Sequence, residues 1–157
     1  MSDIVIDQPI PDFTCQTAEN TPWQLSEQRG HHVVLYFFPR ANTPGCTTES
    51  EAFRDLDPRF GALNTIVVGI SRDKPKTLAN FRDKYGFPFT LLSDPEETVC
   101  NLFGVMRDKN MYGKKVRGIE RSTFLIDSAG VLRQEWRKVS VDGHAEAVLE
   151  AVANLGG

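Results

Sequence analysis

Cys46 is the residue whose position in this sequence most strongly suggests chemistry. It follows a six-residue apolar run, Val33–Phe38, across a turn that includes Thr43, Pro44 and Gly45. Ligands of open α/β sheets bind beyond the carboxyl ends of strands, where the N-termini of helices point. Thr43 suits an N-cap and Pro44 the first helical position, which places Cys46 in the first helical turn. Free backbone N–H groups and the helix dipole there favour a thiolate anion.

A single thiolate at a helix start restricts the reactions that the protein can carry out. Exchange with a neighbouring thiol needs a second cysteine three residues away, and those positions hold Thr43 and Glu49. The sequence has no Cys-x-x-Cys or His-x-x-x-His pair, so we expect no metal and no other cofactor. A cysteine protease needs a histidine base, but no recognisable motif surrounds His31, His32 and His144. There remains attack on an electrophile that carries its own leaving group; a peroxide O–O bond fits, giving a sulfenic acid.

Length and composition agree with an ordinary globular domain. The 157 residues are 40% hydrophobic and 25% charged, and we expect one domain over residues 1–157. A net charge of −3 predicts no binding to nucleic acid or to an anionic membrane, and the longest apolar run is far too short to span one. The N-terminus lacks the basic residues of a targeting segment. An odd number of cysteines favours a reducing compartment, so we expect a cytoplasmic protein.

The elements that must position Cys46 alternate between strands and helices and finish as a hairpin followed by a helix. We expect strands over Phe13–Gln16, Trp23–Leu25, Val33–Phe38, Thr65–Ser71, Thr90–Leu92, Ser122–Asp127 and Val131–Arg137. Helices should follow Thr43, cover Pro75–Tyr85, run from Asp94 to Gly104, and begin near Asp142. The basic segment Arg107–Arg117 is predicted to be a solvated loop or hairpin; the alternative is that its positive charge guides an acidic reductase or an anionic hydroperoxide. This order predicts an α/β fold: a mixed central sheet with helices on both faces and an N-terminal hairpin, arranged as in thioredoxin, with a flavodoxin-like sheet as the alternative.

The segment Pro39-Arg40-Ala41-Asn42-Thr43-Pro44-Gly45-Cys46 resembles the active-site motif of the peroxiredoxins. The wider stretch Tyr36–Glu49 is similar to the PrxQ branch, also called bacterioferritin comigratory protein. The segments Gly118–Asp127, Tyr85–Phe89 and Leu92–Asp94 match that branch too, as does the opening Pro11–Phe13. Because these matches cover nearly the whole chain in order, the resemblance implies a thioredoxin fold and a thiol-dependent peroxidase with an antioxidant role, commonly monomeric.

The resemblance also implies roles for residues around Cys46, the peroxidatic cysteine. Thr43 would direct its hydroxyl at the thiolate and the peroxide, Pro39 would cover the pocket, and Arg121 would stabilise the thiolate and the charge developing on the peroxide oxygens. Gly45 leaves room for a small substrate beside the sulfur. We expect Glu49, one turn after Cys46, to engage Arg121 or to cap the helix start.

The sequence departs from the PrxQ pattern at the resolving cysteine. One family position for that cysteine holds Glu51, and the other falls in Ala79–Asp83, which has none. We expect Cys15 and Cys100 to be buried core thiols. The resulting hypothesis is a one-cysteine cycle in which thioredoxin, glutaredoxin or glutathione reduces the Cys46 sulfenic acid. The alternative is a peroxide sensor or holdase that passes oxidation to a partner protein.

Overall fold

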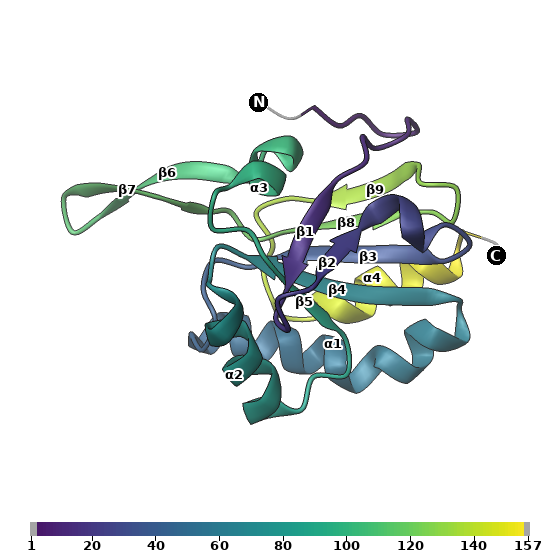
Figure 1. Ribbon diagram of the computed structural model, residues 1–157, viewed down its shortest axis with the longest axis horizontal. Coiled ribbons are helices and arrows are strands. Elements are labelled where there is room, and N and C mark those ends of the chain that lie inside the picture. The colour runs from purple at the N-terminus through teal and green to yellow at the C-terminus, as the bar shows by residue number, and fades with distance from the viewer. Residues whose placement is uncertain (1–2, 156–157) are drawn as a thin grey trace.

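A central seven-stranded sheet organises residues 3–155, which the computed structural model describes apart from the side chains of Lys109 and Met111 (Figure 1). Its strands run in the order β2-β1-β5-β4-β3-β8-β9. Their bounds are Thr14–Thr17 (β1), Pro22–Gln24 (β2), His32–Phe37 (β3), Thr65–Ser71 (β4), Thr90–Ser93 (β5), Ser122–Ile126 (β8) and Leu132–Trp136 (β9).

The pairing directions make the sheet mixed. Strands β3, β4 and β5 are parallel to one another, whereas all pairings that involve β8, β9, β1 and β2 are antiparallel. Every residue of β3 is buried, as expected for a β-branched and aromatic run at the centre of a sheet covered on both faces. The predicted mixed sheet and the leading β1–β2 hairpin are confirmed, and the flavodoxin-like alternative is not what the chain forms.

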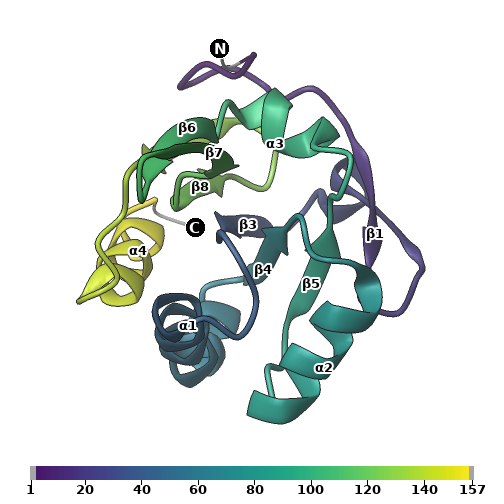
Figure 2. The same ribbon diagram turned by 90° about the vertical axis from the view of Figure 1, so that its left-hand side faces the viewer.

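Helices cover both faces of this sheet, as predicted, but unequally (Figure 2). On one face lie α1 (Pro44–Ala62), α2 (Pro75–Tyr85) and α4 (His144–Ala153), which bury Phe53, Phe81 and Val148 in one apolar cluster. On the other lies the short α3 (Thr98–Phe103), which contributes Cys100 and Phe103 to a second cluster. A 3-10 turn, Leu25–Gln28, follows β2. The sheet therefore separates two cores.

The helix predicted to begin at Asp94 begins later, at Thr98. Asp94 is buried, and its carboxylate accepts a hydrogen bond from the backbone N–H of Cys100, six residues away, at 2.8 Å. Glu97 takes a left-handed conformation (φ 64°) immediately before the helix. The segment after Asp94 is therefore a turn, and the predicted end at Gly104 is confirmed by its left-handed C-cap.

The basic segment predicted as a loop or hairpin forms a two-stranded hairpin, β6 (Met106–Met111) and β7 (Lys114–Ile119). Tyr112 and Gly113 connect the strands, both with positive φ (52° and 78°), which matches the right-handed twist of a tight hairpin. The hairpin extends away from the sheet as an arm, green in Figure 1. We call this pair of strands and its turn the β6–β7 arm.

Candidate active site

Cys46 lies at the start of α1, the helix that follows β3 in the chain. Thr43 is the N-cap of α1 and Pro44 its first residue, so Cys46 falls in the first turn, as predicted. Its side chain is only 1% exposed and packs in the apolar cluster under α1. The turn before Cys46 contacts the loop between β4 and α2: the backbone N–H of Ala41 donates to Asp73 Oδ2 at 2.8 Å. Cys46 therefore stands at the N-terminus of a helix, where the first backbone N–H groups have no acceptor within the helix, beyond the carboxyl end of β3.

Arg121 reaches Cys46 because β8 pairs with β3. The register places Ser122 opposite Phe37, the last residue of β3. Arg121, just before β8, therefore lies beside the segment that connects β3 to α1. Its Nη2 donates to Cys46 Sγ at 3.4 Å. A planar guanidinium offers several donors in one plane, which suits an anion and a second acceptor at the same time.

Glu49 is that second acceptor. Its Oε1 accepts a hydrogen bond from Arg121 Nη1 at 2.7 Å. Of the two expected arrangements, pairing with Arg121 or capping of the helix start, Glu49 therefore takes the first. The side chain is 1% exposed, and Oε2 has no hydrogen-bond partner in the described part of the chain. Burial raises the pKa of this carboxyl to about 7, and the positive charge of Arg121 opposes that rise. One guanidinium therefore serves two acidic groups, the carboxyl and the thiol.

Three further predicted residues surround this pair. Gly45 adjoins Arg121 so closely that a Cβ added there would lie 3.1 Å from Nη2. The hydroxyl of Thr43 donates to the Arg40 carbonyl at 2.8 Å, so it must rotate before it can donate to sulfur or to a peroxide. Pro39, half-buried, lines a recess of about 540 Å³ together with Arg121.

The recess beside Pro39 and Arg121 is also lined by Arg107, Glu120 and Lys138. A second hollow, of about 470 Å³, borders Gly45 and lies between α1 and the turn before α4. The Asp73 contact and the convergence of Arg107, Glu120 and Lys138 on this recess were not predicted, because they depend on tertiary contacts that no local pattern signals.

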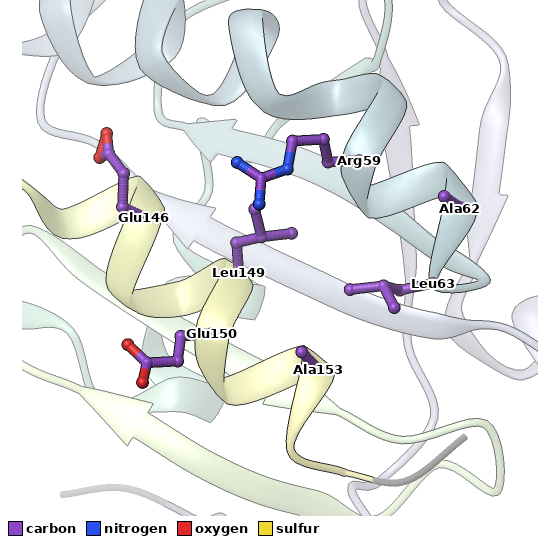
Figure 3. Close-up of a pocket in the computed structure, with 7 residues that line it drawn as sticks. All are labelled: Arg59, Ala62, Leu63, Glu146, Leu149, Glu150 and Ala153. Atoms are coloured by element: carbon purple, nitrogen blue, oxygen red, sulfur yellow. The ribbon is translucent and has the colours of Figure 1, made fainter.

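A larger hollow, of about 600 Å³, lies away from this site. Figure 3 shows it between the carboxyl-terminal half of α1 and α4, with Arg59 and Leu149 facing across it. Its lining contains no thiol and no histidine. Size alone does not identify the site here, since the paired charges converge on Cys46.

The other two cysteines lie in the second core. Cys15 and Cys100 are buried and free, among the apolar residues on the face of the sheet opposite to Cys46. The thiol of Cys15 donates to the Ser93 carbonyl at 3.1 Å, and burial raises its pKa to about 12. Burial also raises the pKa of Cys100, with a further contribution from Asp94. The prediction that both are core thiols is confirmed.

No cluster of histidine, cysteine and acidic residues in the described chain could hold a metal ion. Among residues 3–155 there is also no helix with the length and apolar character needed to cross a membrane. His144 is buried, with Nε2 2.8 Å from Thr123 Oγ1, and burial and Arg121 lower its pKa to about 4.

Comparison with known proteins agrees with this geometry. The chain is 48% identical over 146 residues to a putative Bcp peroxiredoxin of Coxiella burnetii, covering 93% of this chain and 97% of the relative. It is 46% identical to peroxiredoxin Bcp of Xanthomonas campestris, covering 97% and 96%. Among solved structures, the bacterioferritin comigratory protein of Xanthomonas campestris superposes with a TM-score of 0.92 at 44% identity over all of both chains. A PrxQ variant of Xylella fastidiosa gives a TM-score of 0.93 at 38% identity, also over all of both chains.

Residues 6–135 match the AhpC/TSA family. That span contains the whole constellation of Pro39, Thr43, Cys46, Glu49 and Arg121. With a thioredoxin-like fold and full-length relatives of the Bcp type, the chain belongs to the AhpC/TSA family, in the PrxQ/Bcp branch of the peroxiredoxins.

Proposed function

We propose that this peroxiredoxin reduces hydrogen peroxide and small organic hydroperoxides with Cys46 as its nucleophile. The contact of Arg121 with both Cys46 Sγ and Glu49 carries the proposal. The solved Xanthomonas campestris relative is described by its alkyl peroxide reduction activity, which supports the same substrate class for this chain.

The chemical step is an in-line displacement. The Cys46 thiolate attacks one peroxide oxygen, the S–O bond forms as the O–O bond breaks, and the leaving oxygen takes a proton and departs as water or an alcohol. Negative charge moves from sulfur to the leaving oxygen during this step. Arg121 faces the sulfur at the start and would stabilise the charge along its path, which fixed donors do best in a site shielded from water. The hydroxyl of Thr43, once rotated, would donate to the peroxide, and Pro39 would limit the access of water.

The cycle would close through an external thiol. Cys15 and Cys100 lie across the sheet from Cys46, so neither can form a disulfide with it without rearrangement of the sheet's packing. A reductant thiolate would attack the sulfenic sulfur and release water, and a second thiol would then free Cys46 from the mixed disulfide. Thioredoxin, glutaredoxin or glutathione could supply both thiols. The proposal places the enzyme in the cytoplasm as a monomer with an antioxidant role.

Intact-mass measurement after one equivalent of hydrogen peroxide tests this cycle. The expected product gains one oxygen atom, or becomes a mixed disulfide when a thiol is present, and the Cys46→Ser variant gains neither. A product that loses two hydrogens instead would show an internal disulfide and overturn the one-cysteine cycle. Turnover with thioredoxin should be sustained; a single stoichiometric burst would favour a peroxide sensor or holdase over a peroxidase.

A further inference from the structure

The β6–β7 arm carries a charge opposite to that of the rest of the chain. The whole chain has a net charge of −3, the segment 107–117 contributes +4, and the remainder therefore carries −7. The charged side chains of this segment are Arg107, Asp108, Lys109, Lys114, Lys115 and Arg117. An excess of this size on a short projecting hairpin produces a local positive field on an acidic protein.

Among the side chains of the arm that the structure describes, only those at its base form ion pairs. Arg117 forms an ion pair with Glu97 at 3.1 Å, and Arg107 lies 3.9 Å from Glu120. Nearer the tip, Lys114 and Lys115 are exposed, and no ion pair joins their side chains to any residue that the structure describes. The base is thus held in place while the positive charge of the tip stays available.

The tip also presents apolar surface. Tyr112, in the turn, is fully exposed, and Val116 on β7 is 38% exposed. Tyrosine is enriched where proteins bind one another, because its ring adds contact area at a small cost in side-chain entropy. Free lysines around an exposed tyrosine match an acidic protein surface with an apolar centre.

The arm begins at the rim of the active site. Arg107 and Asp108 at its base line the same recess as Pro39 and Arg121. An interface of about 800 Å² per partner extends roughly 16 Å from its centre, and a six-residue strand is about 20 Å long. A protein that places a thiol at Cys46 would therefore cover the base of the arm and approach its lysines.

We propose that the β6–β7 arm is a docking element for an acidic protein thiol, which its free lysines guide to the oxidised Cys46. This inference rests on the proposed external reductant, and it identifies the arm as the surface that this reductant contacts. A small neutral thiol has no use for the arm, since it has neither acidic side chains nor an extended surface.

The test compares reductants with the double variant Lys114→Glu/Lys115→Glu. Cys46 is oxidised with hydrogen peroxide, and its reduction is followed with a thioredoxin of negative net charge or with dithiothreitol. With thioredoxin at low salt we expect reduction to slow roughly tenfold, because reversed rim charges act mainly on the association rate. The difference should disappear at about 1 M salt, where the screening length is about 3 Å. Rates with dithiothreitol and of the peroxide step itself should not change.

The matched control is Arg59→Glu/Lys84→Glu, which changes the net charge of the protein equally. Arg59 lies near the far end of α1 from Cys46 (Figure 3), and Lys84 is in the last turn of α2. This control, and a Lys114→Arg/Lys115→Arg variant, should keep the normal rate with thioredoxin.

Equal rates for the reversed arm and the wild type at low salt would overturn the proposal, as would equal slowing by the control. Slowing confined to oxidation by an anionic fatty-acid hydroperoxide would also overturn it, since the arm would then recruit substrate. If the one-cysteine cycle itself fails, the oxidised protein instead shows an internal disulfide by mass, whatever the arm variants do.

Discussion

Arg121→Ala removes both contacts of the guanidinium at this site, the one with the Cys46 sulfur and the one with the Glu49 carboxylate. In the wild type, Nη2 lies 3.4 Å from Cys46 Sγ. At that separation, a unit positive charge stabilises a thiolate by about 5 kcal/mol at an effective dielectric constant of about 20, an upper limit for the loss. Removal of one fixed donor from a comparable anion site slows catalysis by about 10²- to 10³-fold. We expect a loss of that size in the rate constant for peroxide reduction.

The same substitution leaves Glu49 buried without its partner. Because this carboxyl is 1% exposed and already holds a pKa of about 7, its charged form becomes still less favourable. Breaking a buried ion pair by removing one member costs about 3–5 kcal/mol when the other stays charged; protonation of Glu49 should reduce this cost. The double variant Arg121→Ala/Glu49→Gln should recover most of the lost stability but none of the lost rate.

Stopped-flow measurement of hydrogen peroxide reduction and urea unfolding of the same samples test both expectations. An Arg121→Lys variant, with one compact donor group in place of the planar fork, should fall between alanine and wild type in rate. A rate for Arg121→Ala within about threefold of wild type would refute the transition-state role assigned to the guanidinium. Recovery of rate in the double variant would show that only the unpaired Glu49 had impaired the site.

Three further substitutions test the site and the core. His144 has a pKa of about 4 against 6.5 in an unfolded chain, so its full contribution to the free energy of unfolding is present above pH 6.5 and about 3 kcal/mol should be lost as the pH drops toward 4. Urea unfolding at both ends of this range should show a smaller loss in His144→Gln than in the wild type. An equal loss in the two proteins would contradict the assignment. In Gly45→Ala, the added Cβ must displace the Arg121 side chain, so peroxide reduction should slow severalfold with little change in unfolding, whereas an unchanged rate would show that the guanidinium can yield freely. In Gly69→Ala, the Cβ would come within 2.8 Å of the buried Tyr36 ring, and we expect thermal unfolding to show a loss of about 1–3 kcal/mol, with a normal melting temperature as the contrary result.

The sequence predicts the elements whose signals are local. The Val33–Phe38 run identifies the central strand because a strand buried on both faces needs apolar residues throughout. Thr43 and Pro44 likewise locate the start of α1 and the position of Cys46 within it. These predictions hold because capping and burial act over a few residues.

Features that depend on residues distant in the chain are harder to predict from the sequence. Asp94 resembles a helix cap, yet its carboxylate is committed to the backbone of Cys100, and the helix begins later. Of the β6–β7 arm, Met106 and Ile119 at its base are buried in the core, whereas the described side chains nearer the tip are exposed. The segment therefore lacks the apolar alternation of a half-buried strand, and its sequence does not distinguish a hairpin from a loop. The ion pair of Glu49 with Arg121 likewise arises only when β8 pairs with β3 and brings Arg121 to α1.

The division of the three sulfurs between opposite faces of the sheet has a kinetic consequence. With an internal partner, the oxidised enzyme would be resolved by a first-order step that is independent of the surroundings. In the proposed one-cysteine cycle, with Cys46 alone on its face, resolution would be second order, and the lifetime of the sulfenic acid would lengthen as the thiol pool is consumed. A second peroxide molecule then competes for the same sulfur and forms a sulfinic acid. The susceptibility of this enzyme to inactivation should therefore follow the ratio of peroxide to available thiol rather than the peroxide concentration alone.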